Sequence, residues 1–159
     1  MNQHDIAEIL AKPYSQELLN GKIPSRFAYL GLDGDPRVIP MGFHFDGTNL
    51  QFFTVPKAAK VKALQQNPRV SITIDTDGYP PKVLLLRGSV SVEIVDGVPD
   101  EYLASGKNVP AEAFEGWKAG VLALYDSMAV ITFTPDWAKL LDFETTIPKA
   151  VQDLIDSKS

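Results

Sequence analysis

Short apolar runs bounded by turn residues recur along most of this chain. They have the length of strands and are rich in β-branched and aromatic residues, which predicts strands rather than helices. The expected strands span residues 26–32, 37–45, 50–55, 70–75, 82–95, 129–134 and 138–143. An Asp-Gly pair, Asp46-Gly47, separates the second run from the third, and this pair indicates a hairpin turn. The chain is therefore expected to be mainly β.

Apolar residues at helical spacing fill several of the intervals between these runs. The expected helices span residues 5–10, 15–20, 56–66, 99–105, 111–125 and 148–155. In the helix at 56–66, Pro56 suits the first helical position, because that position needs no N–H partner. Thr54 is a candidate cap for this helix, and Asn67-Pro68 ends it.

The order of elements lacks regular βαβ alternation, which argues against a doubly wound sheet. We expect a mainly β protein with short helices, folded as an antiparallel barrel or a strongly coiled sheet. Residues 1–159 are expected to form one domain, with an N-terminal helical segment at 1–22 and inserted helices at 99–125.

Three residues inside the predicted strands disturb the strand pattern. Pro40 removes a ladder donor and Gly42 permits a close approach to the backbone, so their strand is expected at a sheet edge or against a ligand. Gly88 lies within the long run at 82–95 and predicts a bulge or bend there.

Composition excludes several classes of protein. The formal net charge of −5 argues against a general nucleic-acid binder, which would show a basic face. The absence of cysteine excludes thiolate catalysis, disulfides and cysteine-ligated metal centres, and no metal site is predicted. No apolar run suits a signal peptide or a membrane span, so a soluble cytoplasmic protein is expected.

Three lysines stand close together on this acidic chain, at Lys57, Lys60 and Lys62. They follow a strand that ends in Phe53-Thr54, and a basic spot at a strand-to-helix junction suits a phosphate. On an ideal helix Lys57 and Lys60 lie about 60° apart, whereas Lys62 lies roughly 140° from Lys57. One phosphate would therefore meet Lys57 and Lys60 together. The alternative is that all three lysines form a solvated helix face.

A set of short motifs surrounds this lysine cluster in a fixed order. The motifs are Arg37-Val38-Ile39-Pro40, Asp46-Gly47, Phe53-Thr54, the lysine stretch, Asn67-Pro68-Arg69-Val70 and Arg87-Gly88-Ser89-Val90. In this order they resemble the flavin-binding half of the pyridoxamine 5'-phosphate oxidase-like family, the FMN-binding split barrels.

The resemblance implies an antiparallel split β-barrel that forms a homodimer, with two FMN sites at the subunit interface. A deazaflavin is the alternative cofactor, and the substrate would be a small molecule. The residues that the resemblance assigns to the cofactor are Arg37, Val38, Ile39, Pro40, Gly42, Phe53, Thr54, Lys57, Lys60, Lys62 and Lys82. Of these, Lys82 matches a family glutamine that reaches the flavin from the partner subunit.

The chain departs from the family pattern in three places. The arginine of the usual Arg-Lys phosphate pair is replaced by Ala59, although Lys60 keeps the lysine. A family lysine near the flavin ring is replaced by Gly42. The C-terminus also lacks the Arg-x-His type segment of the vitamin B6 oxidase, so we do not expect that activity.

The expected function is a flavin- or deazaflavin-dependent oxidoreductase, because the cofactor supplies the hydride and electron chemistry. The alternatives are a non-catalytic flavin- or haem-binding carrier or sensor of the same fold, and a small β-barrel interaction domain without a cofactor. His44 is a candidate proton donor or a plain strand histidine. The aromatic residues Tyr29, Trp117, Tyr125 and Trp137 are candidates for stacking on a ring or for packing.

Overall fold

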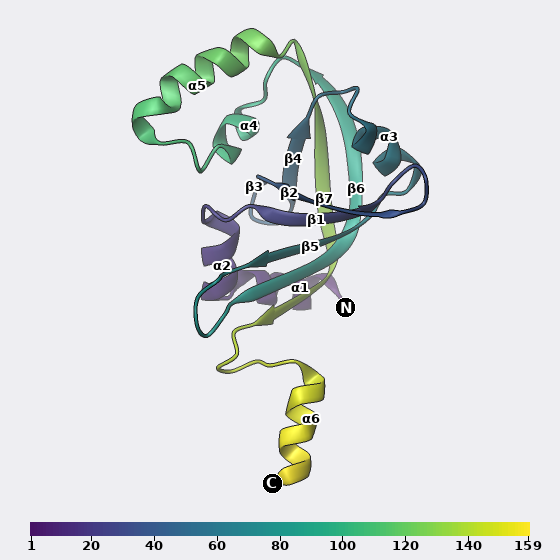
Figure 1. The fold of residues 1–159 in the computed structure, drawn as a ribbon, viewed down its shortest axis with the longest axis vertical. Helices are drawn as coiled ribbons and strands as arrows, with labels where there is room; N and C mark the ends of the chain where they lie inside the picture. Colours follow the sequence, from purple (N-terminus) through teal and green to yellow (C-terminus); the bar gives the residue numbers. More distant parts are fainter.

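Seven strands form one antiparallel sheet in the computed structural model, which describes residues 1–159 (Figure 1). The strands are β1 (Ser25–Leu30), β2 (Pro36–Met41), β3 (His44–Phe45), β4 (Leu50–Thr54), β5 (Arg69–Asp75), β6 (Val83–Asp96) and β7 (Ser127–Leu141). The helices are α1 (Gln3–Ala11), α2 (Pro13–Asn20), α3 (Ala59–Gln66), α4 (Asp100–Ser105), α5 (Ala111–Leu124) and α6 (Lys149–Lys158).

The two edges of the sheet are strands that follow one another in the chain. The strand order is β2-β1-β5-β6-β7-β4-β3, and only Gly42 and Phe43 lie between Met41 of β2 and His44 of β3. Three Cα–Cα steps of 3.8 Å span at most about 11 Å, so the sheet must curl until its edges almost meet. The edges do not pair, and the sheet stays open. This confirms the expected antiparallel split barrel and the edge position of the strand that holds Pro40.

The two longest strands, β6 and β7, lie next to each other in the middle of the curled sheet. β6 and β7 pair from Val83↔Leu141 to Asp96↔Ser127, with a register shift between Arg87 and Gly88. Gly88 pairs with Pro135 and Arg87 pairs with Trp137, which leaves one extra residue, Asp136, in β7. The bulge that Gly88 predicted is therefore confirmed.

The prediction of two separate strands at 129–134 and 138–143 is wrong, because β7 runs without interruption from Ser127 to Leu141. Proline lacks the N–H that a ladder needs, and it is tolerated where a bulge interrupts the ladder. Pro135 occupies such a position opposite Gly88, so it bends the strand without ending it.

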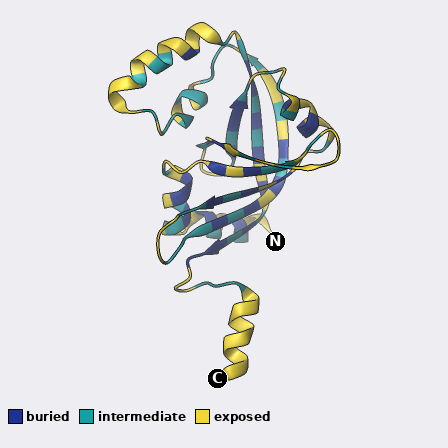
Figure 2. Cartoon of the chain, in the orientation of Figure 1, coloured by how far each residue is buried: buried dark blue, intermediate teal, exposed yellow.

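Four phenylalanines form the centre of the core, three from strands and one from the link between β2 and β3. Phe27, Phe43, Phe52 and Phe133 are all fully buried, and the rings of Phe27 and Phe52 meet edge to face at 4.8 Å. Helices α1 and α2 cover one end of the curled sheet (Figure 2). They contribute the buried residues Ile6, Leu10, Leu18 and Leu19 to the core. Burial of one such side chain contributes about 1.5–3 kcal/mol, so this cluster is the main stabilising element.

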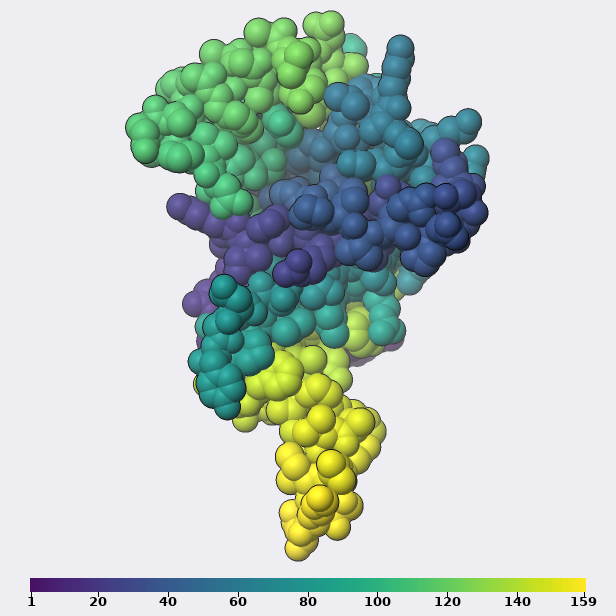
Figure 3. Space-filling view, in the orientation of Figure 1, coloured from purple at the N-terminus to yellow at the C-terminus, as the bar shows by residue number.

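Two helical segments lie outside this core. The segment with α4 and α5 leaves the sheet after β6 and returns at β7, and α5 has only Val121 buried (Figures 1 and 2). Helix α6 projects from the opposite end of the molecule, as the space-filling view shows (Figure 3), and none of its residues is buried. No helix is both long and apolar enough to cross a membrane.

A cradled carboxylate shapes the turn between β7 and α6. The Asp142 side chain is buried and accepts hydrogen bonds from the N–H groups of Glu144, Thr145 and Thr146 at 3.0, 2.7 and 2.8 Å. The Thr145 hydroxyl donates a further bond of 2.6 Å. The Thr145 hydroxyl first, and then these backbone N–H groups, hold the pKa of Asp142 well below its usual range.

We predict that Gly88→Ala destabilises the fold. An added Cβ would lie 2.1 Å from the Thr134 carbonyl oxygen and 2.9 Å from the Pro135 Cα, and neither backbone atom can move freely. The expected loss in the free energy of unfolding is about 1–3 kcal/mol, measured by urea denaturation. Gly120→Ala is the control, because nothing lies within 4 Å of an added Cβ on that exposed helix. Equal stability of Gly88→Ala and the wild type would contradict the bulge.

We also predict that Asp142 contributes to the acid sensitivity of the fold. Its folded pKa is depressed, so its stabilisation is present above the unfolded pKa of about 4 and is lost as the pH falls below it. Asp142→Asn should lower stability at pH 7 and flatten the decline between pH 5 and pH 2. Thermal denaturation across this range tests the prediction, with the exposed Asp77→Asn as control. Parallel pH profiles for the wild type and Asp142→Asn would refute it.

Candidate cofactor site

Residues from β2, β4, α3 and the link between β2 and β3 converge where the two sheet edges approach one another. Pro40 comes from β2, Gly42 from the link to β3, Phe53 from β4 and Lys60 from α3. They line a cavity of about 330 Å³ together with Met41, Tyr102, Ser105, Gly106 and Trp117. The short link between β2 and β3 is the physical reason for this meeting, because it draws β2 toward β4 and α3. Four residues that the sequence assigns to a cofactor thus lie around one cavity.

Helix α3 begins three residues later than the sequence predicts. Ala58 has an extended backbone, at φ −61° and ψ 137°, and its N–H donates to the Val55 carbonyl at 3.1 Å. Pro56 and Lys57 therefore lie in a turn, and Thr54 does not cap the helix. The expected separation of about 60° between Lys57 and Lys60 is wrong, because it assumed that both residues lie on one helix.

The first turn of α3 offers hydrogen-bond donors beside the cavity. The N–H groups of Ala59 and Lys60 donate no hydrogen bond within the chain, and helix N-termini attract anions through such free donors. Lys60 is half-buried and makes no ion pair. The cavity lining contains no carboxylate. These features fit a phosphate group at the α3 end of the cavity.

Aromatic side chains from the inserted helices form the opposite wall. Tyr102 of α4 and Trp117 of α5 stack with their ring centroids 5.8 Å apart and an interplanar angle of 28°. Phe53 meets the Tyr102 ring at 5.6 Å, nearly edge to face. Burial, and to a lesser degree Tyr125, raises the pKa of Tyr102, so its hydroxyl stays protonated at neutral pH. This wall suits a flat organic ring.

Sequence reasoning found only part of this wall. The sequence predicts Trp117 as a stacking candidate, but no motif marks Tyr102, Ser105 or Gly106. The close packing of Gly106 is also invisible in the sequence: an added Cβ there would lie 2.6 Å from the Trp117 ring.

A half-buried lysine ties the inserted segment to the body of the molecule. The Lys107 ammonium donates to the Leu19 carbonyl at 2.9 Å and lies 4.1 Å from the centre of the Phe43 ring. Burial lowers the pKa of Lys107. Lys107 follows the cavity residues Ser105 and Gly106 directly, so its two contacts fix the backbone that forms one side of the cavity. No sequence motif marks this role of Lys107.

The remaining predicted residues lie outside the cavity. Lys57 and Lys62 are exposed and do not line it, and Ile39 and Thr54 are half-buried in their strands. Lys82 precedes β6, where its ammonium bonds Glu17 at 2.8 Å and lies 3.9 Å from the centre of the Tyr14 ring. Within one chain, both of these contacts of the Lys82 ammonium are therefore with residues of α2.

Arg37 and Val38 lie at the other end of β2. The guanidinium of Arg37 bonds the Asp33 carboxylate at 2.6 Å, and this contact holds the pKa of Asp33 below its usual range. Of the remaining candidates, His44 pairs with Gln51 in the β3–β4 hairpin and does not line the cavity.

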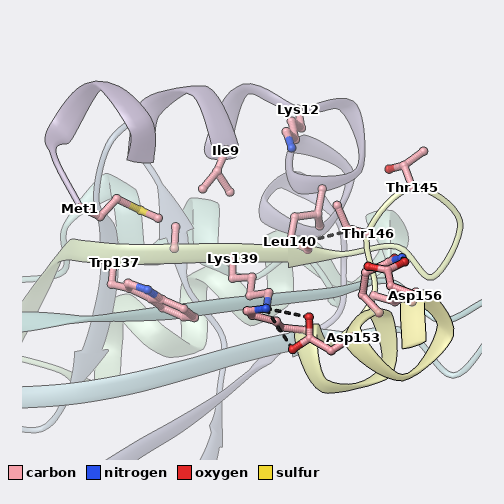
Figure 4. Close-up of a pocket in the computed structure, with 14 residues that line it drawn as sticks. Met1, Ile9, Lys12, Trp137, Lys139, Leu140, Thr145, Thr146, Asp153 and Asp156 are labelled. Atoms are coloured by element: carbon pink, nitrogen blue, oxygen red, sulfur yellow. Dashed lines mark hydrogen bonds and ion pairs between the residues drawn. The ribbon is translucent and has the colours of Figure 1, made fainter. Parts of the chain in front are cut away.

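A larger hollow lies elsewhere, between α1, the end of β7 and α6 (Figure 4). It measures about 770 Å³ and contains none of the residues assigned to the cofactor. Its polar groups include Lys149 and Asp153 of α6, which pair with one another at 2.7 Å. Lys12 and Lys139 also line it without an ion pair, but its lining carries the carboxylates of Asp153 and Asp156, which the smaller cavity lacks.

Comparison with known proteins agrees with this fold. The sequence profile of the pyridoxamine 5'-phosphate oxidase family matches residues 12–140. No curated protein matches the sequence.

Solved structures with the same fold include proteins of three kinds. An F420 reductase is 25% identical with a TM-score of 0.60, over 78% of this chain and 94% of its own. A putative pyridoxamine 5'-phosphate oxidase from Listeria innocua is 20% identical with a TM-score of 0.55, over 88% and 98%. A FAD-binding protein from Mesorhizobium loti is 21% identical with a TM-score of 0.51, over 79% and 89%.

The family match covers most of the chain, from the segment before α2 to the end of β7, and thus includes every element that lines the cavity. The open antiparallel sheet has the architecture of the solved structures as well. This chain belongs to the pyridoxamine 5'-phosphate oxidase family.

Proposed function

We propose that this chain is a flavin- or deazaflavin-dependent oxidoreductase that acts on a small organic substrate, with FMN as the cofactor and a deazaflavin as the alternative. One observation carries the proposal: Lys60, whose backbone N–H is free, meets Pro40, Gly42 and an aromatic wall around one cavity. The family match and the similarity to an F420 reductase and a FAD-binding protein support a flavin-type ligand.

The chain's own residues would bind and orient such a cofactor. Lys60 and the first turn of α3 would hold the phosphate, while the backbone near Pro40 and Gly42 would lie along the ring. Tyr102 and Trp117 would exclude water from the face they cover. The bound cofactor supplies the hydride or electron chemistry, so the cavity needs no nucleophile.

The chain is further proposed to work as a homodimer in which each cofactor lies at the subunit interface. The position of Lys82 supports this arrangement. It lies on the α2 side of the sheet and not at the cavity of its own chain, so only a second copy can bring it to a cofactor.

A spectrum of the purified protein and mass spectrometry of its bound small molecules test the cofactor assignment. We expect a flavin or deazaflavin to co-purify, to be reduced by a nicotinamide donor and to be reoxidised by an organic acceptor. Bound cofactor without turnover would favour a carrier or sensor. A colourless protein that binds neither FMN nor a deazaflavin would refute both forms of the proposal.

Substitution of the α3 lysines tests the phosphate position. Lys60→Ala should weaken FMN binding by about ten- to a hundredfold, because a hydrogen bond to a charged group is worth about 1.5–3 kcal/mol. Lys62→Ala is the matched control: it lies on the same helix but is exposed and away from the cavity, so it should change affinity less than threefold. Fluorescence titration of FMN gives both values, and equal losses would place the phosphate elsewhere.

A further inference from the structure

A second hollow, of about 370 Å³, lies beside the other end of β2 and is basic. Three arginines line it, namely Arg37 from β2, Arg69 from β5 and Arg87 from β6. Its lining contains no aspartate or glutamate, although the whole chain carries a formal net charge of −5. All three lie in the family motifs, but only Arg37 is among the residues that the resemblance assigns to the cofactor, and none of them lines the cavity beside Lys60.

The three arginines differ in what they already bind. Arg69 binds both carboxylate oxygens of Asp136 and the Ser89 hydroxyl. Arg37 is paired with Asp33. Arg87 has no hydrogen bond or ion pair, and its guanidinium lies 4.2 Å from the centre of the Trp137 ring. Arg87 is thus held in place by stacking while its donors stay free for an anion.

Apolar side chains lie beside these charges. Val38 and Leu30 line the same hollow and are 66% and 37% exposed, which is high for large aliphatic residues in adjacent paired strands. The combination of an apolar floor and a free guanidinium suits an organic molecule with a negatively charged end.

We propose that this hollow binds the phosphate or carboxylate group of a small organic anion, with Arg87 as the main contact and Val38 beneath its apolar body. The inference rests in part on the proposed function and names the class of its second substrate: an organic anion that reaches the cofactor along β2. Val38, Ala28, Ser71 and Arg87 lie in one row across four neighbouring strands, so at about 4.8 Å per strand the backbones of Arg87 and Val38 are roughly 14 Å apart. The proposed anion therefore has an extended body.

Inorganic pyrophosphate is a suitable probe, because it carries the anionic group without an organic body. We expect saturable binding to the purified full-length protein, with shifts in the amide resonances of Ala28 and Ser71, which line the hollow. Affinity should fall as salt is added, since the contact is between charges.

Substitution of Arg87 decides whether the hollow is the site. Arg87→Gln should weaken pyrophosphate binding at least tenfold, and Arg87→Lys should retain part of it. Arg26→Gln is the matched control, because Arg26 lies on neighbouring β1 but is paired with Asp75 at 2.9 Å and does not line the hollow. It should change affinity less than twofold. Absence of saturable binding to the wild type, or equal binding by Arg87→Gln, would overturn the proposal.

Titration of FMN into Arg87→Gln separates the two possible sources of the anion. Unchanged FMN affinity with weaker pyrophosphate binding supports a second substrate, as proposed. A parallel loss of FMN affinity would mean that the hollow holds the cofactor's own phosphate, which would overturn the second-substrate assignment. Pyrophosphate binding by a protein that binds no flavin would keep the anion site and refute the proposed function alone.

Discussion

The two-residue link between β2 and β3 is the constraint on which the rest of the structure depends. Because Gly42 and Phe43 join strands at opposite edges of one sheet, the sheet cannot remain flat. The curl surrounds a core centred on Phe27, Phe43, Phe52 and Phe133. It also leaves a gap between the edges, and the cofactor-type cavity lies at this gap with Gly42 in its lining.

The curl is made possible by a local interruption of the longest ladder. The bulge that places Asp136 opposite no partner lets β6 and β7 bend without breaking. Gly88 is the residue that permits this, because any side chain there would strike the backbone of β7. The bulge has a second effect: it turns Asp136 toward Arg69 and Trp137 toward Arg87. The same irregularity thus bends the sheet and arranges the arginines of the second hollow.

Positive charge is placed locally on a chain that is acidic as a whole. Lys60 marks one end of β2, and the arginine-lined hollow marks the other. Local cations of this kind attract small anions, whereas the overall negative charge disfavours nucleic acid. The inserted α4–α5 segment completes the first of these sites, and the contacts of Lys107 with Leu19 and Phe43 hold it against the body.

Much of the fold could be predicted from the sequence because it depends on local patterns. Apolar runs and turn residues gave the strands and the hairpin at Asp46-Gly47, and Pro40 and Gly88 correctly indicated an edge strand and a bulge. Errors arose where neighbouring strands or turns override a local preference. Pro56 begins a turn and not a helix, and Pro135 lies within a strand because the bulge relieves it of a ladder bond.

Some residues of the candidate site could likewise be predicted from the sequence, and others could not. The order of motifs in the sequence, by its resemblance to a known family, grouped Pro40, Gly42, Phe53 and Lys60 with seven further residues that lie outside the cavity. Only the tertiary structure decided that Lys60 and not Lys57 faces the cavity, that Tyr102 and Trp117 form its wall, and that Arg87 stays unpaired beside Arg69. These contacts join residues far apart in the chain, and their geometry is set by the curl of the sheet, which no local pattern specifies.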